Sequence, residues 1–235
     1  MQIPYKIESL AAYRDMVRSK NIPDFKERCL ICNGKNCAVF NGTYPRNAND
    51  PFAKFSQVDF EILQYRCYQK GEKPVTSHVT FTLIPWMLIP YHRLPISFII
   101  FAIQLKINDK LSYVKLLNAL DTIFMNYAEE FNYSFFLNIS TLLYWNSLII
   151  DALIKFQKST VGMSMVPNHL YQNFLSDDRT ERINHFINYL QSYQSQYNNQ
   201  PIEGPVAFAW EFYQKSGGVK KNAFFLFGTA SQHKS

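Results

Sequence analysis

The sequence predicts an α+β fold, in which a small cysteine-bearing β module precedes a mainly helical region. All four cysteines lie within the first 67 residues. Short segments of alternating apolar and polar residues, typical of strands, end by residue 83, and helical spacing dominates after Pro95. A chain of 235 residues with 47% hydrophobic residues can bury a substantial core, and only 8 glycines disfavour a Rossmann-type nucleotide fold.

The first half of the chain reads as a helix followed by a small ribbon of strands. Residues 5–20 place Leu10, Tyr13, Met16 and Val17 near helical spacing. Strands are expected over residues 38–44, 58–68 and 79–83, because apolar and polar residues alternate there. The polar segment from residue 45 to 55 is expected to be a turn-forming link between the first two strands.

The second half reads as helices. They are expected over residues 96–106, 112–120 with an extension to about 129, 139–157, 178–197 and 205–215. Asn138 and Asp178 are suited to cap two of these helices, and Glu181 completes a capping-box pattern with Asp178. Residues 159–176 are expected to be irregular. The predicted division is therefore an N-terminal helix (1–24), a ribbon-like module (25–92), a helical region (93–158) and a C-terminal helical region without an assigned role (159–235).

The cysteines follow the pattern Cys29-x2-Cys32-x4-Cys37-x29-Cys67. A Cys-x-x-Cys loop presents two thiolates to one tetrahedral ion, and a second pair usually comes from a hairpin further along the chain. Here the second pair is incomplete, since Lys70 stands where a cysteine is expected. Cys37 or His78 could replace it, which predicts a zinc site at Cys29, Cys32, Cys67 and Cys37. The alternative is that the cysteines are ordinary buried thiols.

Three stretches resemble the N-terminal region of insertion-sequence transposases and related proteins. They are the Cys29–Cys32 loop, residues 65–67 (Tyr-Arg-Cys) and residues 80–91, whose pattern is similar to a "Thr-Phe-Ser" followed by "Leu-Pro-x-x-Leu-x-Pro-Tyr". The resemblance covers roughly residues 25–120 and departs from the family at Lys70 and at a long insertion, residues 69–79. It implies a degenerate zinc ribbon followed by a helix-turn-helix, with DNA as the partner.

If a helix-turn-helix is present, its second helix would begin near residue 112 and enter the major groove. Val114, Leu117 and Leu120 are then expected to face inward. The residues expected to bind DNA are Ser112, Tyr113, Lys115 and Asn118 on this helix and the basic side chains Arg66, Arg93, Lys106 and Lys110. A solvated helix face explains Lys115 and Asn118 equally well.

The distribution of charge agrees with a polyanionic partner. Residues 1–110 contain 15 Lys and Arg against 9 Asp and Glu, whereas residues 111–235 contain 9 of each. The whole excess of positive charge therefore lies in the first half, as expected for a basic module that meets nucleic acid. A net charge of +6 is also ordinary for a soluble protein.

No catalytic motif is recognisable, and we expect a protein that is not an enzyme. Its partner would be DNA, with a second copy of the chain or a separate transposase subunit as further partners. The alternative is a protein-interaction module with a degenerate ribbon, in which residues 131–136 and the tyrosines of 189–197 form the interface. The start of the chain lacks a signal-peptide pattern, and the apolar run 96–105 is half the ~20 residues of a membrane span. We therefore expect a cytoplasmic protein without membrane association.

Overall fold

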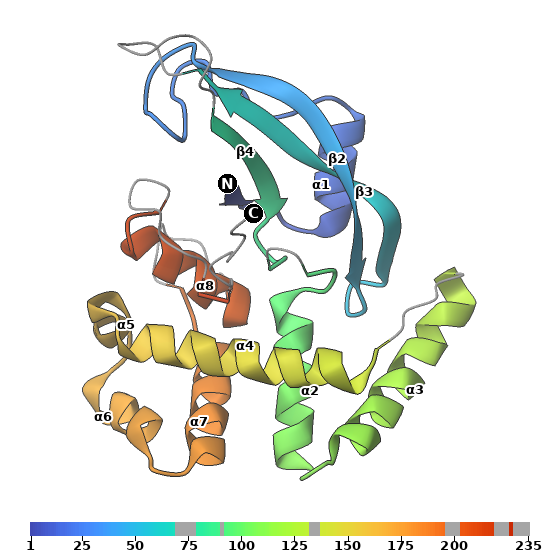
Figure 1. Cartoon of the computed structure of the whole chain (residues 1–235), viewed down its shortest axis with the longest axis vertical. Coiled ribbons are helices and arrows are strands. Elements are labelled where there is room, and N and C mark those ends of the chain that lie inside the picture. The colour runs from blue at the N-terminus through green and yellow to red at the C-terminus, as the bar shows by residue number, and fades with distance from the viewer. Residues whose placement is uncertain (69–78, 90–91, 132–136, 196–202, 219–225, 228–235) are drawn as a thin grey trace.

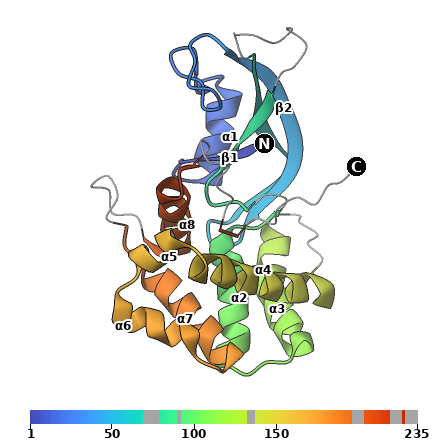
Figure 2. The ribbon, with the colours of Figure 1, turned by 60° about the vertical axis from the view of Figure 1, so that its left-hand side comes forward.

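The computed structural model describes the chain except for residues 69–78, 90–91, 132–136, 196–202, 219–225 and 228–235. The protein is α+β, with a four-stranded sheet and one helix at one end and a layer of helices at the other (Figure 1). Helix α8 (Gly204–Lys215), the last helix among the described residues, returns to lie between these two parts, as Figures 1 and 2 both show.

The sheet contains β1 (Gln2–Tyr5), β2 (Ala38–Asp50), β3 (Phe55–Cys67) and β4 (Val79–Pro85) in the order β1-β4-β3-β2. Strand β1 pairs with β4 in parallel, and the other pairs are antiparallel. The helix expected over residues 5–20 is shorter, α1 (Leu10–Arg18), and Ser9 caps it. Residues 2–5 join the sheet instead, which local spacing could not reveal because the partner strand lies almost 80 residues further along.

The hairpin of β2 and β3 is longer than the sequence indicated. The segment from residue 45 to 55, expected as a link, contributes the end of β2, a four-residue turn and the start of β3. The carboxylate of Asp50 accepts hydrogen bonds from the backbone N–H groups of Phe52 and Ala53 and closes this turn. Two register shifts within β2 interrupt the alternation of apolar and polar side chains. The sequence of this strand therefore shows no regular pattern from which the strand could be predicted.

The core of the sheet module is aromatic. Tyr65 stacks on Phe81 with ring centroids 5.3 Å apart, and the edge of Phe25 packs against both rings. Tyr13 of α1 is fully buried, donates its hydroxyl hydrogen bond to the carbonyl of Leu83 and accepts one from the N–H of Leu63. This side chain therefore joins α1 to two neighbouring strands.

The helices begin after the sheet. They are α2 (Ile96–Asn108), α3 (Tyr113–Phe131), α4 (Ile139–Gln157), α5 (Thr160–Met165), α6 (Asn168–Tyr171), the 3-10 helix η1 (Gln172–Leu175), α7 (Arg179–Ser192) and α8 (Gly204–Lys215). The caps at Asn138 and Asp178 are confirmed, since each side chain accepts hydrogen bonds from backbone N–H groups of the first turn. Residues 159–176 form short helices rather than irregular chain. Glu181 bonds the hydroxyl of Ser176, so the capping box is only half formed.

The helical core is built around Phe156 and Phe208. The tyrosines of α7 and of the residue after it belong to this core: Tyr193 packs edge-on against Phe208 at 4.9 Å, and the Tyr189 hydroxyl donates to the carbonyl of Met165. An interface built from Tyr189 and Tyr193 is therefore wrong. The remaining part of that expected interface, residues 132–136 and 196–197, lies outside the described residues.

Helix α4 has the length and composition of a membrane-crossing helix, with a mean hydropathy of 1.2. In the structure it crosses the middle of the helical layer (Figure 1). One side of it is buried among the other helices, through Leu142, Trp145, Leu148, Ile149, Ala152, Leu153 and Phe156. A core helix of a globular protein that buries one side in this way has the same length and composition as a membrane-crossing helix.

Aromatic contacts at three places among the described residues join the two parts of the molecule. Trp86, just after β4, packs edge-on against Trp210 of α8 at 5.8 Å. Phe52, in the turn between β2 and β3, packs against Phe98 of α2 at 5.5 Å. His92 stacks on Tyr144 of α4 with ring centroids 5.1 Å apart. The sheet is therefore held against the helices at separate points along its lower edge.

Candidate metal centre

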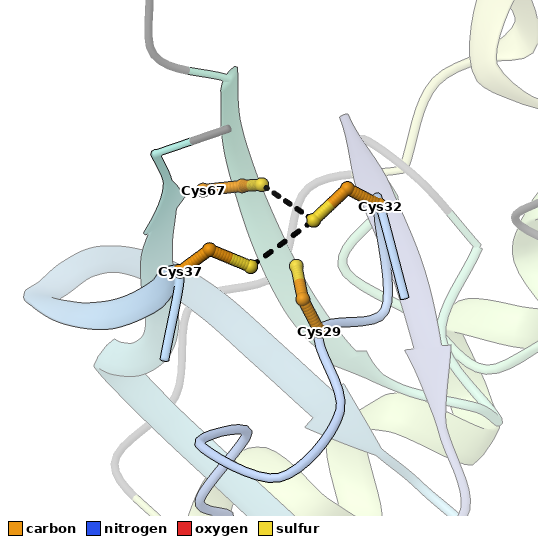
Figure 3. Close-up of side chains that lie close together, drawn as sticks. All are labelled: Cys29, Cys32, Cys37 and Cys67. Atoms are coloured by element: carbon orange, nitrogen blue, oxygen red, sulfur yellow. Dashed lines mark hydrogen bonds between the residues drawn. The ribbon is translucent and has the colours of Figure 1, made fainter. Parts of the chain in front are cut away.

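The four cysteines come together in one cluster. The sulfur atoms of Cys29, Cys32, Cys37 and Cys67 all lie within 4.8 Å of one another, and they point toward a common centre (Figure 3). Cys29, Cys37 and Cys67 are buried, Cys32 is partly buried, and all four are free thiols. Two segments separated by about thirty residues of sheet therefore supply one set of sulfur donors.

The loop from Cys29 to Gly34 presents its two thiols through the backbone. The N–H of Ile31 points at the sulfur of Cys29 and the N–H of Gly34 at the sulfur of Cys32, each at 3.4 Å. Asn33 adopts a positive φ of 57°, and a Cβ on Gly34 would lie 3.3 Å from the sulfurs of both Cys32 and Cys37. The Asn-Gly pair thus permits the tight turn, and the N–H of Gly34 is one of the donors that lower the pKa of Cys32.

The sheet supplies the other two thiols. Ala38 is paired with Cys67 at the end of the β2–β3 ladder, so Cys37, one residue earlier, lies beside Cys67. The N–H of Tyr68 donates to the carbonyl of Cys37 at 2.6 Å and fixes this arrangement. Cys37 is therefore the fourth member of the cluster, which agrees with the first of the two candidates, Cys37 and His78, for the missing ligand. Lys70 and His78 lie outside the described residues.

The surroundings shift the pKa values of the thiols in different directions. Burial acts to raise the pKa of Cys32, but hydrogen bonds from Cys37, Gly34 and the other thiols outweigh it, so its pKa falls below the ordinary value. Burial, together with the role of proton donor to its neighbours, raises the pKa of Cys37 to about 12. Burial likewise raises the pKa of Cys67. A divalent ion would bind the four sulfurs as thiolates, so metal binding here would release protons.

The donor set fits zinc. With Zn–S bonds of about 2.3 Å, the sulfurs of a tetrahedral site are roughly 3.8 Å apart. Cys32 lies 3.6 Å from Cys67 and 3.0 Å from Cys37, slightly closer than this spacing, and the remaining sulfurs lie within 4.8 Å of one another, so small shifts of the side chains would reach this geometry. Four protein ligands would leave no open position, which is the pattern of a structural rather than a catalytic zinc.

The residues expected to bind DNA do not form one surface. Arg66 lies on β3, and Arg93 lies on the link that precedes α2. Lys106 and Lys110 lie at the far end of α2, about 20 Å away along a helix of 13 residues. Ser112, Tyr113, Lys115 and Asn118 begin α3 at this far end, where the Lys106 ammonium lies over the Tyr113 ring.

The face of α3 that packs against the core agrees with the expected one at Leu117 and Leu120 and differs at Val114. Leu116 and Leu120 are fully buried, Leu117 is partly buried, and Val114 is 54% exposed. The expectation that Val114 faces inward is wrong, because the core of the helical layer contacts the face of Leu116 and Leu120, four residues apart. Ser112, Lys115 and Asn118 are exposed, as both the DNA-binding and the solvated-face interpretations require.

No family model, curated protein or solved structure matches the chain. The similarity to transposase N-terminal regions, with its zinc ribbon and helix-turn-helix, therefore stays a prediction that depends on the short stretches quoted for it. The cluster of four thiols is independent of that resemblance, because it follows from the position of the sulfur atoms.

Proposed function

We propose that the protein is a non-enzymatic DNA-binding protein whose N-terminal module is stabilised by a structural zinc ion at Cys29, Cys32, Cys37 and Cys67. The observation that carries this proposal is the convergence of four thiols in the half of the chain that holds all the excess positive charge. Free thiols of this kind persist in a reducing compartment, which supports a cytoplasmic location.

The charges of the sheet module are only partly neutralised within the protein. Arg14, Lys26 and Lys35 form exposed ion pairs with Asp15, Asp24 and Glu27. Within the part of the chain that the structure describes, Arg46, Arg66 and Arg93 have no carboxylate partner. Guanidinium groups without an internal carboxylate partner are suited to phosphate oxygens, which they bind in a bidentate manner.

Binding to duplex DNA at increasing salt tests the proposal. Three phosphate contacts give a slope of about −2.7 in a plot of log K against log salt, so affinity should fall about forty-fold between about 50 and 200 mM salt. The measurement is fluorescence anisotropy with a labelled duplex and the zinc-loaded chain. Absence of binding both to this duplex and to a single strand of the same sequence at about 50 mM salt would rule out the DNA-binding function.

A protein-interaction function is the second candidate, and one observation favours it. Helix α4 exposes Ile139, Leu143 and Ile154, with exposed fractions of 40, 46 and 41%, at spacings that place them on one side of the helix. Association through this face would be insensitive to salt and would appear as a concentration-dependent increase in mass by light scattering. Salt-sensitive DNA binding by a monomer would argue against this second function.

A further inference from the structure

A cavity of about 650 Å³ lies on the sheet, and all four strands contribute to it. Its lining includes Gln2 of β1, Thr80 and Thr82 of β4, Gln64 of β3, and Tyr44 and Arg46 of β2, with Arg93 from the link before α2. Side chains of a strand alternate between its faces, so Gln64 points away from the face that carries Leu63, Tyr65 and Cys67. The cavity and the cysteine cluster therefore lie on opposite faces of the sheet.

A row of polar groups crosses the cavity. The register pairs Gln2 with Thr82 and Thr82 with Gln64, so the three side chains are adjacent on one face. The Gln64 carbonyl oxygen accepts a hydrogen bond from the side chain of Asn41 at 2.8 Å, which leaves its amide N–H groups to donate. The Gln2 carbonyl oxygen is buried and accepts no hydrogen bond within the described residues. This oxygen is shielded from any molecule in the cavity, so the row would meet a ligand through Gln64 and Thr82 rather than through the Gln2 oxygen.

The positive charge of the cavity comes from Arg46 and Arg93. The lining includes no Asp or Glu, and neither arginine pairs with a carboxylate among the described residues. The guanidinium of Arg46 donates to the backbone carbonyl of His92, which directs this side chain to the same end of the cavity as the link that carries Arg93. Burial lowers the pKa of Arg46, as expected for a cation that has lost water without gaining an anion. An anionic group held here would be bound in a partly desolvated site.

We propose that this cavity binds one nucleoside phosphate unit, with its phosphate on Arg46 and Arg93 and its sugar or base edge on Thr82 and Gln64. The volume suits a ligand of that size and is too small to enclose a duplex. The unit therefore belongs to a single strand or is a free nucleotide. The single-strand case rests on the proposed DNA-binding function and moves the contact surface from the start of α3 to the sheet. A groove with positive charge on a sheet is a common way of holding single strands.

The test uses the full, zinc-loaded chain and fluorescence anisotropy of a labelled single-stranded oligonucleotide. The same sequence as a blunt duplex, adenosine monophosphate and inorganic phosphate serve as competitors. The informative variant is Arg93→Gln, because Arg93 is exposed and its loss leaves the core intact. Arg46→Lys keeps the charge but removes the forked guanidinium. Arg18→Gln, an exposed arginine of α1, is the matched control with the same change of charge, and Lys115→Gln probes the start of α3.

Arg93→Gln should weaken binding of the single strand about tenfold and lower its salt slope by about 0.7, whereas Arg18→Gln and Lys115→Gln should change affinity less than about twofold. The single strand and adenosine monophosphate should compete, and the duplex should compete poorly.

The remaining outcomes separate the cavity from the proposed function. DNA binding that is weakened by Lys115→Gln and unaffected by Arg93→Gln would overturn the cavity proposal and leave the DNA-binding function standing. Binding of adenosine monophosphate that Arg93→Gln abolishes, without any DNA binding, would keep the cavity and remove the DNA-binding function. Absence of binding to every probe would overturn both.

Discussion

The hydroxyl of Tyr13 offers a quantitative test of how the sheet module is held together. It donates to the carbonyl of Leu83 at 2.6 Å and accepts from the N–H of Leu63 at 3.0 Å, and the side chain is fully buried. Tyr13→Phe would leave two buried backbone groups without partners. Each such group costs about 1–3 kcal/mol, so the free energy of unfolding should fall by about 3 kcal/mol. Burial raises the pKa of Tyr13, so the hydroxyl is protonated at neutral pH and available to donate.

Urea unfolding followed by circular dichroism measures this loss as a shift of the midpoint at unchanged slope. In thermal unfolding the same loss corresponds to a decrease of about 6–12 °C for a chain of this length. Tyr5→Phe is the matched control, because Tyr5 lies in contact with Tyr13 and its hydroxyl makes no hydrogen bond within the described residues. The reasoning would be refuted if Tyr13→Phe and Tyr5→Phe had equal midpoints.

Two further predictions concern the helical layer and its junction with the sheet. A Cβ on Gly162 would lie 2.2 Å from the backbone oxygen of Phe156, so Gly162→Ala should destabilise the chain by about 3 kcal/mol, while Ser164→Ala, at an exposed position of the same helix, should have little effect in the same urea assay. Burial, and then the charge of Arg46, lowers the pKa of His92 from 6.5 to about 4. Between these pH values the imidazole is protonated in the unfolded chain but neutral in the folded chain. Stability should therefore decrease as pH falls from 6.5 to 4, by up to about 3 kcal/mol more in the wild type than in His92→Gln. Parallel stability profiles of the two proteins across that range would contradict this assignment.

Strong local signals in the sequence predicted the helical half. The span of α4 and the caps at Asn138 and Asp178 agree with the structure, because an apolar face and a capping side chain are read within a few residues. The phase of α3 could not be predicted, since its sequence offers apolar residues on more than one face. Val114 and Leu116 are both apolar, and only the position of the neighbouring helices decides that Leu116 is buried and Val114 exposed.

The sheet was predicted less well, because its organisation depends on distant pairing. Strand β1 has a partner almost 80 residues away, and the bulges of β2 remove the alternation on which strand prediction relies. The cavity could not be predicted for the same reason. Gln2, Thr82 and Gln64 are far apart in the sequence, and only the register of the sheet places them side by side. The alternation of Thr80 and Thr82 with Phe81 and Leu83 was the one signal that could have marked a polar face.

The spacing of the cysteines predicted the metal centre only in part. Cys29, Cys32 and Cys67 followed from the Cys-x-x-Cys loop and the strand end, but the choice between Cys37 and His78 as the fourth ligand depends on the pairing of Ala38 with Cys67. Because that pairing places Cys37 beside Cys67, the four-cysteine set is the one that the structure supports.

The zinc content of the purified chain tests the central claim most directly. We predict one zinc ion per chain by mass spectrometry under native conditions. Cys37→Ser should lose this ion, and a chelator should lower the melting temperature of the wild type but not of the variant, because zinc binding contributes to folding. A chain purified without metal, which binds none when zinc is added and whose melting is the same with and without chelator, would contradict the claim.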